Sequence, residues 1–408
     1  MDSTLGIFTT GYPYFLKKFR NQDSDIYKTR VLLKKAIVMK GEEAAEIFYD
    51  TEKFKRKDAA PKRLRKTLFG EGGVQGLDEE RHKQRKALFM RFMNPASIND
   101  LEKHFNKHWL KALKEWEKEK SVILFNESKT ILFRAACEWT GVPLREEEAE
   151  ERAKQVGLLI ESAGAVGLKH RHGRKAREEA EAWIAGMVKE IRANRLQLRQ
   201  DCALYAYSMF KDTDGELLPA RVVGVEILNL LRPIVAISRY IVYSAHALHK
   251  YPRYRQKLKD SDGELYRPFV QEVRRFYPFF PFVAARVKKK FKWKEVKFPK
   301  DRLVLLDLFA TNHDKEIWED AGEFIPERLY DWKESPFSFI PQGGGDHYTN
   351  HRCAGEWVTI QLTRSALVFL VEKMDYEVPN QNLSVKLSDL PALPKSGFKI
   401  KNVRSLGA

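Results

Sequence analysis

The sequence predicts a mainly α-helical protein with a small β-rich part, folded as one large domain over residues 1–408. Two observations lead to this fold class. Apolar residues recur at three- and four-residue spacing over long segments, with charged residues between them. Strand-like alternation is confined to a few short segments. Because no repeat, low-complexity linker or break in composition divides the chain, we expect a single domain.

The expected elements follow in chain order. A first strand-like segment lies near residues 29–41, a second near residues 296–309, and a third is the tail "SGFKIKNV". Helical spacing covers residues 79–93, 100–117, 146–160, 173–199, 218–250 and 353–374. No apolar run approaches the roughly 18 residues of a membrane span. The N-terminus has an acid at position 2 and lacks the apolar core of a signal peptide, so no transmembrane segment or leader is expected.

The net charge of +17, from 73 basic and 56 acidic residues, raises the question of a nucleic-acid partner. The basic residues are spread along the whole chain with acids interleaved, and neither zinc-finger cysteine pairs nor an RNA-recognition signature is present. A solvated basic surface is the better interpretation, so we expect no nucleic acid. Such a surface would also attract anionic small molecules.

The chain has three cysteines, Cys137, Cys202 and Cys353. Widely spaced thiols in a long chain argue against a disulfide framework and for a reducing compartment, so we expect a cytoplasmic protein. Cys137 lies in an apolar helical pattern and Cys202 follows a basic helix without a sign of chemistry. Cys353 alone has an unusual setting.

Cys353 lies near the end of the glycine-rich stretch "FSFIPQGGGDHYTNHRCAGEW", at the start of a helical pattern. The N–H groups and dipole of a helix start favour a thiolate, the form that binds metal or attacks carbon. A phosphate-binding loop is excluded because the Gly-Lys-Ser/Thr ending is missing. A catalytic pair of Cys353 with His351, a small buried cysteine, and an axial thiolate to haem iron all stay open from the loop alone.

Two upstream motifs bear on this choice. Glu272 and Arg275 in "QEVRRFYPFFPF" are three residues apart on a helix, so their side chains can pair. Arg328 follows in "FIPERL". Glu-x-x-Arg, Pro-Glu-Arg and a glycine loop ending in Cys-x-Gly, in this order, resemble the cytochrome P450 superfamily over nearly the whole chain. The resemblance implies a mainly α fold, haem b, and Cys353 as the thiolate ligand of its iron.

The same resemblance implies a set of bases that hold the haem propionates. His82 and Lys86 are four residues apart in "HKQRK" and resemble the superfamily's His-x-x-x-Arg. Arg56 and Arg286 lie in segments that resemble other propionate contacts, and His351 matches a position near the propionates. The plain alternative for each is an ordinary exposed base.

The chain departs from the superfamily pattern in two places. Gly343 to Cys353 is ten residues where six are usual, and Gln342 stands where Phe is expected, which alters packing and hydrogen bonding on the thiolate side. In "EILNLLRPIVAIS", Arg232-Pro233 stands near the position of the acid and threonine that deliver protons to bound dioxygen. Pro233 must kink the helix. A buried Arg232 would be costly unless a carboxylate pairs with it, either from a ligand or from a protein acid, of which Glu226 is nearest.

These departures resemble the bacterial fatty-acid peroxygenase branch of the superfamily. The resemblance implies hydroxylation of long-chain fatty acids at the α or β carbon with hydrogen peroxide, without a redox partner. The substrate carboxylate, held by Arg232, would act as general acid–base. Arg232, Pro233 and Gln75 are the expected catalytic residues, and Gln75 favours hydroxylation over decarboxylation to a terminal alkene. The expected substrate-binding residues are Arg232, Leu68, Phe69, Ile160, Phe279 and Phe282.

Other functions stay open from the sequence. Decarboxylation by the same site and a reductase-fed haem-thiolate monooxygenase share the fold. A non-catalytic haem-thiolate sensor belongs to a different class and is disfavoured because nothing resembles an output domain.

Overall fold

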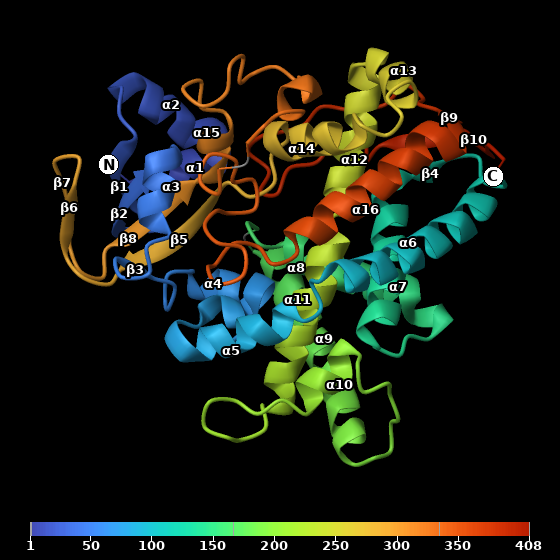
Figure 1. Ribbon diagram of the computed structural model, residues 1–408, viewed down its shortest axis with the longest axis horizontal. Coiled ribbons are helices and arrows are strands. Elements are labelled where there is room, and N and C mark those ends of the chain that lie inside the picture. The colour runs from blue at the N-terminus through green and yellow to red at the C-terminus, as the bar shows by residue number, and fades with distance from the viewer. Residues whose placement is uncertain (1, 166, 334, 408) are drawn as a thin grey trace.

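The computed structural model describes residues 2–165, 167–333 and 335–407. Figure 1 shows the larger sheet and the N-terminal helices at one end of the molecule and the long helices at the other. The helices are α1 Thr4–Thr10, α2 Pro13–Gln22, α3 Glu42–Phe48, α4 Lys62–Leu64, α5 Glu79–Met90, α6 Pro95–Trp116, α7 Leu124–Thr140, α8 Ala149–Glu161, α9 Leu168–Arg192, α10 Ala203–Ser208, α11 Ala220–Ala236, α12 Ser238–Lys250, α13 Arg253–Lys259, α14 Tyr266–Phe276, α15 Leu308–Asn312 and α16 Glu356–Val368.

The described residues contain three sheets. The largest has the strand order β1-β2-β8-β5-β3, with β2 and β8 parallel and the other neighbours antiparallel. The strands are β1 Ile26–Val31, β2 Lys34–Met39, β3 Phe54–Lys55, β4 Val122–Ile123, β5 Phe282–Val287, β6 Phe291–Trp293, β7 Val296–Phe298, β8 Leu303–Asp307, β9 Met374–Glu377 and β10 Lys399–Ser405. Short turns of helix are η1 Arg65–Phe69, η2 Val74–Gly76, η3 Glu146–Glu148, η4 Pro326–Leu329 and η5 Phe369–Lys373.

The start of α6 is fixed by local sequence signals. Asn94 precedes α6 and its side chain accepts a hydrogen bond from Ser97 N at 3.0 Å, while Pro95 occupies the first helical position. Both choices satisfy or avoid the unpaired N–H groups of a first turn.

The main apolar core lies between α6, α7, α11, α12 and α16, with fully buried Trp109 and Ile227 among its members. No helix in the described part of the chain is both long and apolar enough to cross a membrane.

The predicted helical segments are confirmed with shifted ends, and three segments differ. The strand-like segment 296–309 comprises β7, β8 and the first two residues of α15. Residues 29–41 are not one strand: β1 and β2 form a hairpin through a two-residue turn, Leu32-Leu33, with Val31 opposite Lys34. The segment 218–250 is two helices, because the helix that contains Pro233 ends at Ala236 and a new one begins at Ser238. The interruption lies after Pro233, whereas the hydrogen bond that a proline removes is in the turn before it, so Pro233 does not by itself account for the break.

Candidate active site

The glycine loop packs tightly against the rest of the protein. Gly343 and Gly345 have φ values of 91° and 83°, which glycine adopts without strain. A Cβ on Gly344 would lie 2.5 Å from the Pro336 carbonyl oxygen, and one on Gly345 would lie 3.1 Å from the Tyr49 ring. The consecutive glycines therefore let the loop turn and approach its neighbours before it reaches the cysteine.

Cys353 lies three residues before α16, not in its first turn as the sequence predicted. Its N–H donates to the Gln342 carbonyl oxygen at 3.3 Å. Burial raises the pKa of the Cys353 thiol, whereas the Gly355 N–H and the cations Lys86 and Arg274 act in the opposite direction. The net direction differs from the sequence expectation because the helix start is further away and burial outweighs it. A bound metal ion would still deprotonate the thiol.

Gln342 explains the first departure from the superfamily pattern. Its side-chain amide lies 3.6 Å from Cys353 Sγ, with Nε2 as the donor, and also donates to Thr359 Oγ1 at 3.1 Å. Its Oε1 accepts from Arg274 Nε at 3.1 Å. The amide thus replaces an aromatic packing residue with a hydrogen-bond donor to sulfur, which is the altered bonding that the sequence predicted for this side of the site.

Four of the predicted cofactor-binding bases meet beside Cys353. The rings of His82 and His351 stack with centroids 4.0 Å apart. Lys86, one turn after His82 on α5, donates from Nζ to the carbonyl oxygen of Arg352, the residue before the cysteine, at 3.0 Å. Arg56 lies over the Phe48 ring at 4.3 Å. The charge of Arg56 acts on both histidines, so residues 56, 82, 86 and 351 form one basic cluster, in which His82 and Lys86 are buried and the other two are half-buried.

Burial and the proximity of the bases to one another lower their pKa values. Burial lowers the pKa of His82 to about 3, and His351, Lys86 and Arg56 add to this lowering. Burial likewise lowers the pKa of His351 to about 4 and that of Lys86 to about 8. Asp78 is the opposing acid: its Oδ1 lies 3.8 Å from His351 Nε2. At neutral pH the two histidines are therefore neutral, and Arg56 and Lys86 carry the positive charge that would face a bound anion.

Arg286, another predicted cofactor-binding base, contacts backbone carbonyl groups in the structure. It lies on β5, and its guanidinium donates to the backbone carbonyl oxygens of Asp58 and Asp301, both at 2.8 Å. These contacts tie two surface turns to the sheet. Its role as a propionate contact stays a prediction.

Arg232 is buried on α11 and points to the loop before α5. Its Nη1 donates to the Leu68 carbonyl oxygen, and its guanidinium lies 5.8 Å from the centre of the Phe69 ring. Burial and the neighbouring Arg177 lower the pKa of Arg232 to about 9, against the attraction of Cys353. The guanidinium stays protonated at neutral pH. Glu226, the acid that the sequence offered as its partner, pairs elsewhere.

Arg177, on α9, is a second buried arginine at this place. It donates to the carbonyl oxygens of Leu68 at 2.8 Å and Phe69 at 3.1 Å, and its Nε pairs with Glu181 at 2.7 Å. Two guanidinium groups thus share the Leu68 carbonyl oxygen. Arg177 has its own carboxylate, whereas among the described residues Arg232 forms no ion pair.

Gln75 belongs to a buried polar chain next to these arginines. Its Oε1 accepts from Asn229 Nδ2 at 3.0 Å, and Asn229 also donates to Glu226 at 3.1 Å. Glu226 in turn pairs with Arg85 at 2.7 Å. Asn229 lies three residues before Arg232 on α11, so one helix carries both the anchor for Gln75 and the free guanidinium.

The predicted apolar substrate residues come from separate elements. Leu68 and Phe69 lie on η1, and Ile160 is buried on α8. Phe279 is buried against Tyr240 of α12, with ring centroids 4.9 Å apart. Phe282 begins β5 and is half-buried. Their roles as a substrate channel stay a prediction.

The motif residues Glu272, Arg275 and Arg328 meet in the fold, and the predicted pair of Glu272 with Arg275 is confirmed. Arg275 forms a two-pronged ion pair with Glu272 at 2.7 Å for each bond, and Arg328 Nε lies 3.7 Å from Glu272 Oε1. Arg275 also donates to the carbonyl oxygens of Asn312 and Ala321, both at 2.9 Å. The cluster therefore joins α14 to the segments before the glycine loop.

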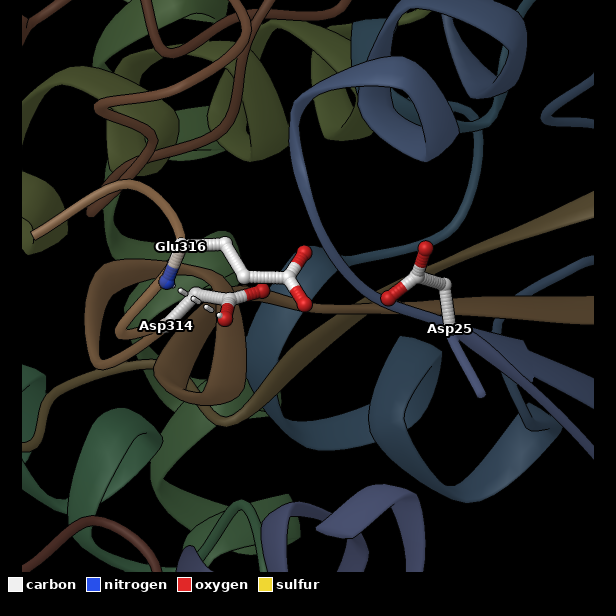
Figure 2. A group of neighbouring side chains, drawn as sticks. All are labelled: Asp25, Asp314 and Glu316. Carbon is white, nitrogen blue, oxygen red and sulfur yellow. Dashed lines mark hydrogen bonds between the residues drawn. The ribbon is translucent and has the colours of Figure 1, made fainter. Parts of the chain in front are cut away.

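A group of three carboxylates near the start of β1, away from the glycine loop, surrounds the side chain of a lysine. Figure 2 shows Asp25 facing Asp314 and Glu316, whose oxygens lie within 4.8 Å of one another. Lys40 Nζ is 3.0 Å from Asp25 Oδ1 and also pairs with Asp314. The ammonium group of Lys40 bridges Asp25 and Asp314, so this cluster serves to hold the start of β1 and the segment after α15 together.

A family model described as cytochrome P450 matches residues 264–401. Beta-amyrin 28-monooxygenase of Barbarea vulgaris is 23% identical over 414 residues, covering 94% of this chain and 84% of that protein. Among solved structures, cytochrome P450EX alpha (CYP152N1) with myristic acid is 45% identical, with a TM-score of 0.96 over 99% of this chain and 98% of that chain.

Two further structures agree. Cytochrome P450SP alpha (CYP152B1) in complex with (R)-ibuprofen is 42% identical, with a TM-score of 0.97 over 99% of each chain. Cytochrome P450 OleT is 34% identical, with a TM-score of 0.97 over 100% of this chain and 98% of that chain. The chain belongs to the CYP152 family of cytochromes P450. This is the fatty-acid peroxygenase branch that the sequence predicted, so the predicted fold and the enzyme class, an oxidoreductase that uses hydrogen peroxide, are confirmed.

As a cytochrome P450 the protein takes a haem, and its residues fit one. Cys353 supplies a sulfur of the kind that holds haem iron. The basic cluster of residues 56, 82, 86 and 351 suits two propionates, and Arg56 Nη1 is buried without a hydrogen-bond partner among the described residues. An anion at this place would satisfy that orphaned donor.

Sequence reasoning missed three polar residues of this CYP152 site. Arg177 lies on the buried face of α9 with Gly173, Ala180 and Ile184, a spacing that could have revealed it. Asp78 and Asn229 gave no such signal. Their partners are distant in the chain, so only the fold brings them into contact.

Proposed function

We propose that this protein hydroxylates long-chain fatty acids at the α or β carbon with hydrogen peroxide, on haem b ligated by Cys353. Residues 1–408 act as one haem-thiolate peroxygenase domain. The observation that carries the proposal is the buried guanidinium of Arg232, which has a backbone carbonyl but no carboxylate as its partner among the described residues. A fatty acid supplies the missing carboxylate and a long apolar chain.

The haem b form is supported by the cysteines. Covalent attachment of haem through thioethers uses a Cys-x-x-Cys-His motif, which this sequence lacks. Cys137 and Cys202 are buried and unpaired. Binding through Cys353 and the basic cluster therefore accounts for the cofactor. The unpaired cysteines also support the predicted cytoplasmic location.

Arg232 gives the substrate a fixed orientation. Its planar guanidinium can donate two parallel hydrogen bonds to a carboxylate, which sets the direction of the chain as well as its position. The Leu68 carbonyl oxygen, which accepts from Arg177 as well, also accepts from Arg232 and fixes the position of its guanidinium. The carbons next to the carboxylate are then the ones nearest the reacting centre.

The carboxylate also replaces the absent acid–threonine pair. When bound, haem supplies the iron that accepts an oxygen atom from peroxide and oxidises a C–H bond. The carboxylate held by Arg232 takes a proton from one peroxide oxygen and returns it to the other, which leaves as water. The balance is one fatty acid and one hydrogen peroxide to one hydroxy acid and one water, so no reductase and no dioxygen enter.

Turnover with peroxide alone tests this function. We expect the haem-loaded protein, palmitic acid and hydrogen peroxide to yield 2- or 3-hydroxy acid, identified by mass spectrometry after derivatisation. The methyl ester of palmitic acid is the matched control and should be nearly inert, because it cannot pair with Arg232. Product that forms only with a reductase, a nicotinamide cofactor and dioxygen would support the reductase-fed monooxygenase in its place.

Gln75 is expected to bias the reaction toward hydroxylation. A neutral amide is a poor proton donor, whereas a histidine can deliver a proton near neutral pH. Replacing Gln75 with His should therefore raise the share of terminal alkene among the products, and more so as the pH is lowered. Gas chromatography of the products from Gln75→His and the control Gln75→Asn measures this share. An unchanged ratio in Gln75→His, with haem content intact, would remove Gln75 from the mechanism.

A further inference from the structure

The turn between β1 and β2 presents two leucines to solvent. Leu32 and Leu33 have φ values of 50° and 64°, and their side chains are 50% and 81% exposed. A two-residue hairpin turn with both residues left-handed is the usual place of Asn-Gly, because bulky side chains are strained there. Leucine in this conformation gains nothing from burial within the chain.

The hairpin turn is nevertheless held firmly. Leu32 N donates to Thr4 Oγ1 at 2.6 Å, and Leu33 N donates to Asp2 Oδ2 at 2.8 Å. These bonds connect the turn to the start of α1. Leu5 and Phe8 lie one turn apart on α1 and are also exposed, at 73% and 44%. We call these four side chains, Leu5, Phe8, Leu32 and Leu33, the apolar tip.

A basic surface adjoins the apolar tip. It is an open groove across the β1–β2 hairpin and the segment before β8, and its lining includes Lys28, Arg30, Lys35, Lys297 and Arg302. Lys34 lines a second, neighbouring groove, where the one acid is Asp301. Asp301 already pairs with Lys55 at 2.7 Å. We call residues 28, 30, 34, 35, 297 and 302 the basic face.

We propose that the apolar tip and the basic face dock the protein onto the surface of an anionic phospholipid bilayer. Exposed apolar side chains that insert at the acyl boundary, beside lysines and arginines that meet the headgroups, are the combination that holds proteins at a membrane surface. A second copy of this chain fits poorly, because a two-fold contact would set the basic face against itself. A nucleic acid would use the basic face but not the four apolar side chains.

The docking surface is joined to the segment between α8 and α9. α1 ends at Gly11, where a Cβ would lie 1.8 Å from the Leu387 carbonyl oxygen. Leu390, three residues after Leu387, packs closely on Gly164: a Cβ on that glycine would lie 2.6 Å from the Leu390 carbonyl oxygen. Gly164 follows Ile160, an expected substrate residue. Fatty acids partition into bilayers, so docking would bring the protein to its substrate, a reason that rests on the proposed function; the docking itself rests on the surface alone.

Sedimentation with lipid vesicles tests the proposal without peroxide or substrate, so its failure is distinct from failure of the proposed function. The haem-loaded full chain should bind vesicles of phosphatidylglycerol and phosphatidylcholine much more tightly than vesicles of phosphatidylcholine alone. Binding should weaken as salt is added, because salt screens the basic face. Equal binding to both vesicle types, or none, would overturn the proposal.

Two double variants separate the parts of the surface. Leu32→Asn with Leu33→Gly should weaken vesicle binding by about tenfold or more, since it removes the inserted side chains. Lys34→Gln with Lys35→Gln should weaken vesicle binding by a similar factor, because each lysine removed takes away attraction to the anionic headgroups. The matched controls are Leu110→Asn, which removes a leucine that is also 50% exposed, and Lys103→Gln with Lys114→Gln on α6. These controls should bind as the unaltered protein does.

The leucine variant also carries its own check on folding. Asn-Gly suits the left-handed turn, so this variant should have an unchanged or higher melting temperature while losing vesicle binding. A lower melting temperature together with lost binding, or full binding, would count against the apolar tip. If the unaltered protein is a dimer in sedimentation velocity and the leucine variant is a monomer, the surface is an interface between copies and the proposal is wrong.

Discussion

The Cys353→Ala protein is expected to lose the strongly red-shifted Soret band that a thiolate-ligated haem gives after reduction and addition of carbon monoxide. The thiol of Cys353 is the proposed soft ligand at the end of the glycine loop, where the Gln342 amide donates to its sulfur and the charges of Lys86 and Arg274 act on it. Alanine cannot replace a sulfur ligand. Absorption spectroscopy of the reduced protein with carbon monoxide makes the measurement.

The design separates loss of ligation from loss of cofactor. The basic cluster of residues 56, 82, 86 and 351 remains in the Cys353→Ala protein, so part of the haem should stay bound and show a spectrum without the thiolate shift. Haem content, measured as the pyridine complex, should therefore fall less than the shifted band. Cys202→Ala removes a cysteine outside the glycine loop and should keep the band. A Cys353→Ala protein with the full band would sink the assignment of the ligand.

Much of the fold was predictable because it depends on local spacing. The amphipathic segments became α5, α6, α8 and α9 with shifted ends, since one apolar face is enough to specify a buried helix. The β1–β2 hairpin was missed because its turn carries Leu32-Leu33 in place of the Asn or Gly that marks such turns. The turn therefore departs from the usual residue preference of such turns, and it leaves both leucines exposed.

The site was predictable where its partners are close in the chain. Glu272 and Arg275 are three residues apart, and their ion pair is confirmed at 2.7 Å. Sequence alone could not decide whether Arg232 pairs with a protein acid, because that depends on the partner of Glu226. In the fold Glu226 pairs with Arg85 of α5, so the nearest acid is unavailable to Arg232. The contact of Asp78 with His351 likewise joins loops that only the fold brings together.

Recognition and catalysis should be inseparable at Arg232. If its guanidinium only bound substrate, Arg232→Ala would raise KM and spare kcat. In the proposed mechanism the carboxylate it holds is also the acid–base group, so Arg232→Ala should abolish hydroxylation even at saturating fatty acid. A charge-assisted hydrogen bond contributes about 1.5–3 kcal/mol, so the loss of two should also weaken fatty-acid binding by orders of magnitude.

Further variants and ligands distinguish this mechanism from simple loss of structure. Arg232→Lys should recover little, because a point charge cannot hold both carboxylate oxygens in one plane. Arg192→Ala is the matched control: Arg192 also donates to backbone carbonyl oxygens, those of Ser208 and Leu218, at 2.9 Å and 2.7 Å. It should keep its activity at a modest cost in melting temperature.

A small carboxylate should act where the fatty acid does. Acetate is expected to pair with Arg232 in the unaltered protein and to restore the acid–base group without an attached chain. Peroxide-driven oxidation of an unrelated small molecule, such as guaiacol, should then rise with acetate concentration, and the Arg232→Ala protein should not respond. Product analysis, initial rates and fatty-acid titrations followed by the Soret band provide the measurements. Full activity of the Arg232→Ala protein on fatty acid and peroxide would refute the substrate-assisted mechanism, because no other described cation at this place lacks a carboxylate of its own.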